Sequence, residues 1–516
     1  MNRMTISRRS LLATGAAAAS TLAVGRGIGI GAAAAPDRWS EVVRASAIDD
    51  SALDDLRARL NGTVMVPGDS GFATANAPAN GRYLSVQPAA VARVADHADV
   101  VTAIQWCNEN GVRLVGRGGG HSYAGLSTTT ELLLDLRRLN HVKIDRKAGT
   151  VRSGGAALNA DFFTATENGP FFLPGGTCLG VGSGGLALGG GIGYNAHWAG
   201  LTCDHMLAST IVTADGQTLT IDATTNNDLF WACRGGAGGN FGINTDFTFR
   251  LQEVPQEVSF YRFDWTGSDA AVAVHGAFDK LLSEAPAALN AVAMSEVTPI
   301  DAGGDERDAI HTMSRGQYIG PVDELKELVA PLAAIGTPTT STIQDMTFWD
   351  VQRMIATPEP ASHSFGDISR YAKEPLPEAA ISAMIDLLAQ CPSRTDDANG
   401  SVWSLGWVGG DVIGSLSRTE TAYVHRDAHT LWRPTTVWPD AADPSVADGL
   451  NAWTDGIIDI LTPLTPNESY QNFPNRDIAD FADQYYAENL SRLIDVKTKY
   501  DPKNFFQNAQ SIPPRG

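Results

Sequence analysis

The order of hydrophobic and polar positions changes about half-way along the chain. Up to about residue 254, short apolar runs typical of buried strands alternate with stretches whose apolar positions recur at helical spacing. These runs predict strands at 83–86, 112–115, 132–134, 150–153, 209–213, 218–221 and 245–251. They predict helices at 49–60, 91–108 and 161–168, and a short helix that begins at Asn227 or Asp228. Asp215-Gly216 predicts a hairpin turn between two of these strands.

Beyond residue 254 the expected strands alternate between polar and apolar positions, as in a sheet whose two faces differ. Such strands are predicted at 258–263, 291–297, 401–407 and 435–437. Amphipathic helices are predicted between them, at 269–282, 322–334 and 377–391. A long helix is predicted at 477–500, where Asp501-Pro502 ends it. The pattern indicates an antiparallel sheet covered by helices, in a chain of the α+β class.

These changes divide the chain into four expected parts. Residues 1–35 form a leader, 36–254 a first domain with its core at about 84–254, and 255–465 a second domain. Residues 466–516 form a segment that we expect to return to the first domain. The sequence contains neither an internal repeat nor a low-complexity linker, so we expect the two domains to share a close interface.

The composition is typical of a globular, loop-rich protein. The chain has 516 residues, of which 43% are hydrophobic and 52 are glycine. Its formal net charge is −20, so nucleic acid or an anionic membrane would be repelled at long range. We therefore expect no nucleic-acid partner, and the simplest role of the acidic surface is solubility.

The first 35 residues have the organisation of an export signal. Arg8 and Arg9 form a twin-arginine pair, and an apolar, alanine-rich run follows at 11–24. Residues 32–35 supply small side chains for cleavage before Pro36. The apolar run is too short for a good membrane span, and no later stretch of the sequence qualifies. We expect a protein that is exported in folded form, has no membrane anchor after processing, and works outside the cytoplasmic membrane.

The five cysteines are too few for a dense disulfide framework in a chain of this length. None belongs to a C-x-x-C pair, and no spacing of histidine and cysteine resembles a metal site. If Cys178 serves a cofactor, four remain, and buried thiols are the default for such residues. The sequence leaves open any disulfide among Cys107, Cys203, Cys233 and Cys391.

Three glycine-rich loops need a functional explanation. They lie at 116–125, 174–193 and 234–242, and the first two each carry one nucleophile, His121 and Cys178. Glycines outside a repeat allow backbone conformations and close approaches that other residues cannot adopt. Clustered backbone N–H groups in such loops form concave sites for anions. The loops therefore predict a site for a phosphate or pyrophosphate, next to two nucleophiles.

These motifs resemble the berberine bridge enzyme-like branch of the vanillyl-alcohol oxidase and p-cresol methylhydroxylase family of FAD-linked oxidases. Residues 116–123 look like the family loop whose histidine attaches to the flavin 8α-methyl group. Residues 176–191 look like the loop whose cysteine attaches to flavin carbon 6. Further segments that match family motifs follow in order along nearly the whole mature chain, at 201–204, 212–216, 228–232, 234–242, 470–473, 499–506 and 510–514.

The resemblance implies a two-part FAD-binding domain of p-cresol methylhydroxylase type at 36–254 and a substrate-binding domain at 255–465. It implies FAD that is bicovalent, joined to His121 and Cys178, in an open site that suits bulky substrates. A neutral imidazole can form the first link, and a nest of N–H groups would favour the thiolate for the second. The other residues expected to bind the cofactor are Arg117, Gly118, Gly119, Gly120, Ser122, Gly125, Gly175, Gly176, Thr177, Gly182, Gly185, Gly189, Gly190, Gly193, Asn240, Gly242, Asn472 and Asn504.

Two further positions are expected to act in the chemistry. The residue three past the cysteine influences oxygen access in the family, and a valine there, here Val181, goes with oxidases. Related enzymes often carry a Y-x-N-Y motif whose second tyrosine can act as the base, but this chain has Phe473 at that place. Tyr470 is the surviving phenol, and its pKa would need lowering from about 10. The other candidates for the base are Asp367, Tyr371, Tyr423 and His429.

The leading hypothesis is a secreted FAD-dependent oxidase that takes a hydride from a substrate alcohol and is reoxidised by O₂ to give H₂O₂. The favoured substrate is the anomeric hydroxyl of a sugar or oligosaccharide. The reasons are the export signal, the open flavin site and the aromatic side chains of the tryptophans at 403, 407, 432 and 438. The same fold would also suit a tailoring oxidase of a polycyclic or aromatic natural product or amine. A third hypothesis, of a different class, is a flavin-binding protein without turnover. The expected partners are a small-molecule substrate and O₂.

Overall fold

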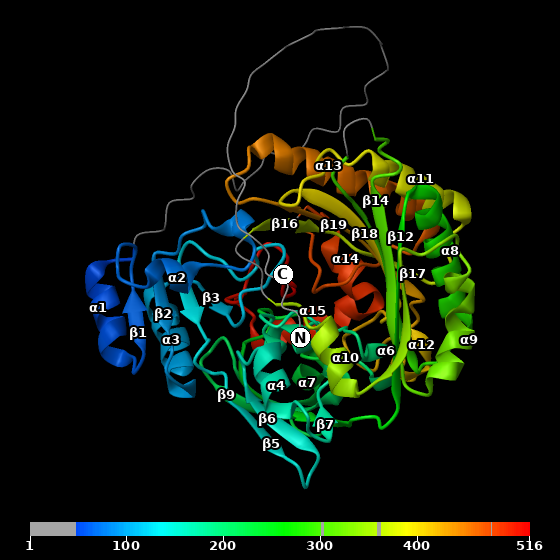
Figure 1. The fold of residues 1–516 in the computed structure, drawn as a ribbon. Coiled ribbons are helices and arrows are strands. Elements are labelled where there is room, and N and C mark those ends of the chain that lie inside the picture. The colour runs from blue at the N-terminus through cyan, green and yellow to red at the C-terminus, as the bar shows by residue number, and fades with distance from the viewer. Residues whose placement is uncertain (1–47, 301–303, 359–362, 476) are drawn as a thin grey trace, which may run out of the picture. The chain divides into compact units, whose positions relative to one another are not determined.

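The computed structural model describes residues 48–300, 304–358, 363–475 and 477–516. The expected export signal lies outside the described residues. The described residues belong to one unit, Val43–Gly516, in which an eight-stranded sheet lies beside a four-stranded and a five-stranded sheet, and β7 (Phe171–Phe172) pairs with β11 (Gln252–Glu253) in a small two-stranded sheet (Figure 1). This mixture of helices and largely antiparallel sheets confirms the predicted α+β class. The predicted domain limits stay a prediction.

The first sheet has the strand order β1-β2-β4-β3. Its strands are β1 (Thr63–Met65), β2 (Ala90–Arg93), β4 (Leu132–Asp135) and β3 (Leu114–Arg117). Strands β2, β4 and β3 run parallel, and β1 pairs antiparallel with β2. Parallel neighbours need a crossover connection, which α3 (His97–Asn110) supplies between β2 and β3. Helix α1 (Asp50–Arg59) packs beside α3, and α2 (Phe72–Asn76) covers the apolar side chains of β1 and β2.

Two sequence predictions in this region are wrong. The expected strand at 83–86 is replaced by the 3₁₀ turn η1 (Gly81–Tyr83), because the Asn80 side chain accepts a hydrogen bond from the Arg82 amide and caps the turn. The expected helix at 91–108 begins only at His97. The Asp96 carboxylate caps it by accepting a hydrogen bond from the Asp99 amide at 3.1 Å, and the apolar residues before it form β2.

The second sheet is antiparallel throughout, in the order β5-β6-β10-β8-β9. Its strands are β5 (Val142–Asp145), β6 (Thr150–Gly154), β10 (Ile243–Arg250), β8 (Met206–Val212) and β9 (Thr218–Asp222). Gly216 has a φ of +79° in the turn between β8 and β9, which confirms the predicted hairpin. Shorter elements around this sheet are α4 (Asn159–Thr166), β7 (Phe171–Phe172), α5 (Ser183–Leu188), α6 (Ala196–Ala199), η2 (Thr202–His205), α7 (Asn227–Ala232) and β11 (Gln252–Glu253).

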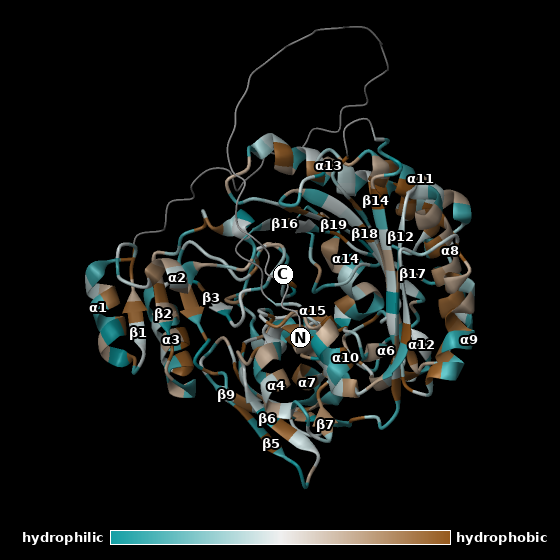
Figure 2. Ribbon diagram, in the orientation of Figure 1, coloured by the Kyte–Doolittle hydropathy of each residue, from teal (hydrophilic) through white to brown (hydrophobic). Residues whose placement is uncertain are grey.

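The third and largest sheet has the order β15-β12-β14-β13-β18-β19-β16, with β17 paired to β19. Its strands are β12 (Val258–Thr266), β13 (Leu289–Val297), β14 (Ile310–Tyr318), β15 (Thr340–Met346), β16 (Ser364–Asp367), β17 (Arg370–Ala372), β18 (Asn399–Leu405) and β19 (Thr430–Trp438). Helices α8 (Ser268–Glu284), α9 (Val322–Ala333), α11 (Glu378–Ala389) and α13 (Pro444–Leu461) cover one face, with brown apolar sides toward it (Figure 2).

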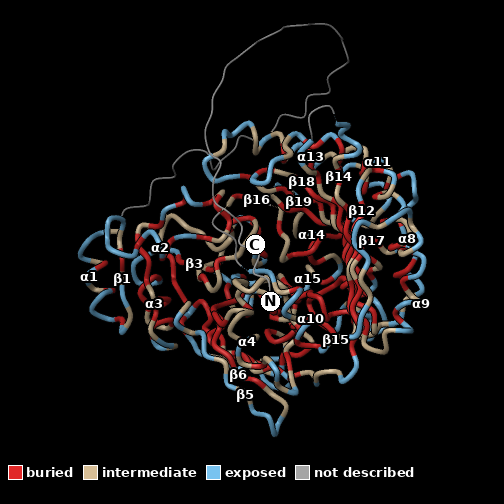
Figure 3. Tube along the Cα trace, in the orientation of Figure 1, coloured by how far each residue is buried: buried red, intermediate tan, exposed pale blue. Residues whose placement is uncertain are grey.

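The other face of this sheet turns inward, toward the glycine loops. Its residues share a buried cluster with Tyr371, Tyr423 and Tyr470, and the buried segments concentrate along this junction (Figure 3). Helices α10 (Phe348–Ile355) and α12 (Gly410–Ile413) and the turn η3 (Thr462–Leu464) complete this part of the fold. None of the helices in the described part of the chain is long and apolar enough to cross a membrane.

The end of the chain differs from the prediction of one long helix at 477–500. It contains α14 (Phe481–Tyr486), the 3₁₀ turn η4 (Ala487–Asn489) and α15 (Leu490–Tyr500). Ala487 has a φ of +40°, a conformation that no α-helix contains, so the helix must break there. Cys107, Cys203, Cys233 and Cys391 are buried and form no disulfide among the described residues.

Candidate functional site

The loop that carries His121 begins where β3 ends. The Arg117 guanidinium is 1% exposed and donates to the carbonyl oxygens of Asn76 and Ser127, so this buried side chain fixes the start of the loop. Gly120 has a φ of +74° and Gly125 a φ of +67°, conformations that favour glycine. A Cβ on Gly125 would also lie 2.6 Å from the ring of Tyr83.

The loop that carries Cys178 runs against the first loop, backbone to backbone. A Cβ on Gly119 would lie 2.5 Å from the nitrogen of Gly182, and a Cβ on Gly182 would lie 2.7 Å from the nitrogen of Gly119. On its other side this loop bonds to Thr357, whose carbonyl accepts from the Leu179 amide at 3.0 Å. The Asn159 side chain donates to the Cys178 carbonyl at 2.9 Å. The structure thus brings the two predicted tether loops together.

The predicted glycines divide into two groups. Some pack so closely against the protein that a Cβ would clash, and these serve the fold: Gly119, Gly125, Gly182, Gly189, Gly190, Gly193 and Gly242. Others leave space on the Cβ side, with ordinary contacts at Gly118 and Gly175 and nothing within 4 Å at Gly185. Gly120 and Gly176 lie between these groups, with the nearest atoms at 3.3 and 3.1 Å.

Unused backbone donors accumulate in the same two loops. The amides that donate to no other described residue include those of Gly118, Gly119, Gly120, Ser122, Gly176 and Thr177. Because buried or half-buried N–H groups are almost always hydrogen-bonded, such a run indicates a partner outside the chain. A curved row of N–H groups suits an anion.

The third glycine loop and the C-terminal segment hold each other. Asn240 donates to the Gly236 carbonyl at 2.9 Å and accepts from the Ile512 amide at 2.9 Å. Its own carbonyl accepts from the buried Lys497 ammonium at 2.7 Å. Asn240 is therefore occupied by protein contacts, whereas Asn504 has a φ of +52° and a buried side-chain oxygen without a partner among the described residues.

Tyr470 and Asn472 close the end of α5. The Tyr470 hydroxyl oxygen accepts hydrogen bonds from the amides of Gly191 at 2.9 Å and Ile192 at 3.1 Å, and from the Asn472 side chain at 3.0 Å. Asn472 also donates to the Leu186 carbonyl at 2.8 Å. Burial raises the pKa of Tyr470 to about 12, although these hydrogen bonds act to lower it. These contacts indicate a positioning role, and the predicted catalytic role of Tyr470 stays a prediction.

An ion pair on the large sheet lies next to both tether loops. The Arg433 Nε atom donates to Asp367 Oδ2 at 2.7 Å, and the guanidinium lies 5.6 Å from the ring centre of Tyr123. Burial raises the pKa of Asp367 to about 6, against the attraction of Arg433. Burial alone would lower the pKa of Arg433, but Asp367, Tyr123 and Cys178 together hold it above its ordinary value. The second tether residue therefore lies within the field of a cation, which favours a thiolate.

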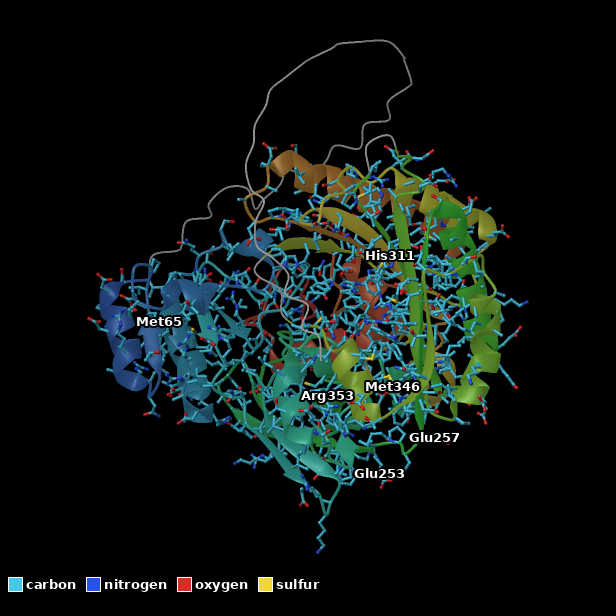
Figure 4. The ribbon with its side chains drawn as sticks, viewed as in Figure 1. Met65, Glu253, Glu257, His311, Met346 and Arg353 are labelled. Carbon is cyan, nitrogen blue, oxygen red and sulfur yellow. The ribbon has the colours of Figure 1, made fainter. Side chains whose placement is uncertain are left out.

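The inward face of the large sheet carries a row of apolar and aromatic side chains with charged side chains at its ends. Strand register aligns Met313, Met294, Trp403 and Arg433 in one row across β14, β13, β18 and β19. Asp264 of β12 pairs with Met313 and extends this row, and the next residues outward on β14 and β13 are His311 and Glu296. His311 bonds to Glu296 at 3.0 Å and to Asp264 at 2.9 Å, and Figure 4 labels it on β14. The hydrogen bonds to Glu296 and Asp264 raise the pKa of His311, and the bond to Glu296 has the larger effect.

A cavity of about 80 Å³ adjoins the second tether loop. Gly176, Thr177 and Leu179 line one side of it, and Phe163 of α4 and Trp349 of α10 line the other. Arg353, at the end of α10 (Figure 4), bonds to Glu167 at 2.7 Å and so ties α10 to the end of α4. Val181 lies nearby, and its carbonyl accepts from the Asn159 amide at 3.0 Å.

Among the alternative bases, Tyr371 and Tyr423 bond to each other through their hydroxyls at 2.8 Å, and both are fully buried. Burial raises the pKa of each phenol well above its ordinary value. His429 bonds to Asp279 at 2.8 Å on the helix-covered side of the sheet. Of these four candidates, Tyr423 packs against Gly190 of the second loop, and Asp367 lines a small cavity together with Tyr123 of the first loop.

Comparison with known proteins places the chain in a family. The family model described as FAD binding domain matches residues 88–222, and the model described as berberine and berberine like matches residues 469–513. The uncharacterized FAD-linked oxidoreductase YgaK of Bacillus subtilis is 32% identical over 468 residues, which cover 89% of this chain and 98% of that protein. The chain belongs to the berberine bridge enzyme-like family of FAD-linked oxidases.

Other members of this family act on sugars, as their names state. The chitooligosaccharide oxidase of Gibberella zeae is 30% identical over 458 residues, 84% of this chain and 88% of that protein. The solved glucooligosaccharide oxidase of Acremonium strictum superposes with a TM-score of 0.79 at 25% identity, covering 90% of this chain and 100% of that one. That enzyme carries a 6-S-cysteinyl, 8α-N1-histidyl FAD.

FAD fits the two loops of this family member. The unused amides of Gly118, Gly119 and Gly120 suit the pyrophosphate, and the space beside Gly185 admits a ligand without displacing protein. The half-buried His121 and Cys178 stand on the two joined loops.

Sequence reasoning missed Tyr123, Phe365 and Arg433 as site residues. Tyr123 stood in the first motif, two residues after His121, and its position was a usable signal. Arg433 carried a weaker signal, a charge in the middle of a strand whose neighbours are apolar. The packing of Phe365 onto Tyr123 depends on pairing between strands that are distant in sequence, so no local sequence pattern predicts it.

Proposed function

We propose that this protein is an exported oxidase that oxidises the anomeric hydroxyl of a sugar or oligosaccharide to a lactone, with FAD joined to His121 and Cys178. The contact of Gly119 with Gly182 carries the proposal, because it holds the two nucleophiles on one site in front of the large sheet. FAD bound there would accept the hydride from the substrate carbon and pass its electrons to O₂, giving H₂O₂.

The inward face of the large sheet supports a carbohydrate substrate. Trp403 is partly exposed and offers an aromatic surface, and its indole nitrogen is held by Ser401 at 2.9 Å. Glu296 and His311 add polar groups at one side of it. Aromatic surfaces next to a few fixed polar groups suit ligands that have both apolar and hydroxyl-bearing faces. The names of the related chitooligosaccharide, glucooligosaccharide and xylooligosaccharide oxidases point to the same substrate class.

Oxygen uptake with defined sugars tests this function. We expect uptake, with one H₂O₂ formed per O₂ consumed, for at least one of cellobiose, xylobiose and N,N′-diacetylchitobiose. The Trp403→Ala variant should raise KM strongly and leave the flavin content unchanged, because Trp403 contributes to substrate binding and not to the cofactor loops. Uptake with none of the sugars would contradict the substrate class.

The alternative of a polycyclic or aromatic substrate also has an observation in its favour. Met294, Met313, Phe365 and Phe473 give the same region a mainly apolar lining. Uptake with phenolic or alkaloid substrates, and none with sugars, would select this alternative. If no substrate of either class consumes O₂ or bleaches the flavin anaerobically, the protein is a flavin carrier without turnover.

The two covalent links have a direct test. After denaturation in acid, the wild-type polypeptide should stay yellow, as should His121→Ala and Cys178→Ala, because one link suffices to hold the flavin. The double variant should lose its colour. Cys391→Ala is the matched control, since this thiol is buried beside α11 and α13, away from both loops. Colour released from the wild type would refute covalent attachment.

Export by the twin-arginine route is a further part of the proposal. Substitution of Arg8 and Arg9 by lysine should keep the folded, yellow protein in the cytoplasm, whereas the wild type should reach the outside. Equal distribution of the two forms would contradict it.

A further inference from the structure

The position at which related enzymes carry their second tyrosine is occupied here by a ring that cannot accept a proton. Phe473 stacks on Tyr123 with the ring planes 3° apart and the centroids separated by 5.5 Å. On its other side it meets Tyr470 edge to face at 5.0 Å. Any base that the chain supplies must therefore be a residue other than Phe473, and the two tyrosines that contact its ring are the first candidates.

Tyr470 is poorly suited to that task. Its oxygen already accepts three hydrogen bonds, from Gly191, Ile192 and Asn472, and the side chain is 0% exposed. A substrate hydroxyl has no open position on this oxygen.

Tyr123 has the contacts that a proton acceptor needs. Arg433 Nη2 lies 3.4 Å from the Tyr123 hydroxyl, and the guanidinium lies 4.4 Å from the centre of the Phe473 ring. Asp367 holds Arg433 from below through Nε at 2.7 Å. A cation held at this distance stabilises a phenolate. The ring of Tyr123 is half-buried and lies 5.7 Å from the ring of His121, so its hydroxyl is close to the tethered edge of the cofactor site.

We propose that Tyr123, positioned by Arg433 and Asp367, is the proton acceptor that replaces the missing tyrosine at Phe473. The inference rests on the proposed alcohol oxidation. In that step the substrate O–H bond breaks and its proton forms an O–H bond with the Tyr123 phenolate. The electron pair of the broken O–H bond forms the new C=O bond. The C–H bond breaks at the same carbon, and its hydrogen would leave with both electrons as hydride, which bound FAD would accept.

A small cavity offers the proton a way out behind Tyr123. Its volume of about 20 Å³ is enough for one water molecule, and Tyr123 and Asp367 line one side of it. Arg82, Tyr83, Asp455 and Asp477 are among the other residues that line it. Among the described residues, the charged or titratable groups around Tyr123 thus include Arg433 and Asp367 on the large sheet, His121 and Cys178 on the tether loops, His363 beside Phe365, and Arg82, Tyr83, Asp455 and Asp477 at the cavity.

A spectroscopic titration tests the inference without any substrate. The near-ultraviolet tyrosinate band of the folded holoenzyme should contain one group that ionises below the ordinary tyrosine pKa of about 10. Tyr123→Phe should remove that group. The matched control Tyr318→Phe should retain it, because Tyr318 lies at the end of β14 and donates to the Glu324 carboxylate. A low-pH tyrosinate that persists in Tyr123→Phe, or one that is absent from the wild type, would overturn the proposal.

Anaerobic bleaching of the flavin by cellobiose, xylobiose or N,N′-diacetylchitobiose gives the second readout. Tyr123→Phe should slow bleaching by about 10²–10⁴-fold, the usual contribution of a general base. The double variant Tyr123→Phe/Phe473→Tyr should recover part of the rate, because the phenol returns one ring away. A Tyr123→Phe enzyme that keeps the wild-type rate would refute the inference. Failure of all three sugars to bleach the wild type would instead refute the proposed substrate, and the titration would still decide the role of Tyr123.

Discussion

The buried ammonium of Lys497 is the contact whose loss should cost the protein most stability. The side chain is 0% exposed and donates to the carbonyls of Asn240 at 2.7 Å and Phe506 at 2.6 Å, and to the Asp501 carboxylate at 2.7 Å. Burial lowers the pKa of Lys497, although the contact with Asp501 raises it. The Lys497→Met variant keeps the volume of the side chain and removes its charge and all three donors.

The expected cost follows from what is left behind. Asp501 would stay buried and charged, with only the amides of Phe505 and Phe506 as donors. Removal of one partner from a buried ion pair costs about 3–5 kcal/mol. Unfolding entropies of about 2.1 cal/mol/K per residue give about 1 kcal/mol/K for a chain of this size. We therefore expect Tm to fall by about 3–5 °C, if the protein unfolds as one unit.

Differential scanning calorimetry of the yellow protein measures this change, at a fixed scan rate because large proteins often unfold irreversibly. Lys499→Met is the matched control. Lys499 is 59% exposed and pairs with Asp228 on the surface, so we expect a loss of less than about 1 kcal/mol. The double variant Lys497→Met/Asp501→Asn should lose less stability than Lys497→Met, because the unpaired charge is gone. Equal effects of Lys497→Met and Lys499→Met would refute the reasoning.

Three further predictions concern acid stability, loop contact and oxygen. Burial acts to raise the pKa of Glu468, but hydrogen bonds from His425 and Arg418 outweigh it and hold the pKa at about 2. This stabilisation is present above the unfolded pKa of about 4.3 and is lost as the pH falls toward 2. Glu468→Gln should therefore lose about 3 kcal/mol less free energy of unfolding than the wild type over this range, and its Tm should fall less steeply with acid. Parallel curves for the two proteins would contradict this sign. Gly119→Ala should lower stability by about 1–3 kcal/mol and reduce bound flavin, whereas Gly276→Ala, which has open space in α8, should gain up to about 1 kcal/mol. Equal flavin contents would contradict the coupling of the loops. Val181→Leu should slow flavin reoxidation by O₂ in stopped flow and leave anaerobic reduction by substrate unchanged, and the reverse pattern would assign Val181 to substrate binding.

Features that follow from the backbone conformation of a few neighbouring residues could be predicted from the sequence. The positive φ values of Gly120, Gly125 and Gly216 favour glycine whatever surrounds them, and the sequence contains glycine there. The hairpin of β8 and β9 and the helices over the large sheet follow from the same kind of local pattern.

Features that depend on distant neighbours were not predictable. Strand β14 buries Thr312, Ser314 and Gln317, so its sequence lacks the apolar alternation that marks a strand. The partner of Arg433, Asp367, lies 66 positions away on a strand too short to be recognised alone. The break at Ala487 is set by tertiary packing, since the sequence there is compatible with a continuous helix.

The return of the chain's end to the third glycine loop has a consequence for biosynthesis. The Asn240 side chain meets the amide of Ile512, and Lys497 joins the Asn240 carbonyl to that of Phe506. A ribosome must therefore release almost the entire polypeptide before this side of the cofactor site can assemble. Binding of FAD to the completed loops must therefore follow translation. A chain that is truncated before these last residues would have an incomplete FAD-binding site.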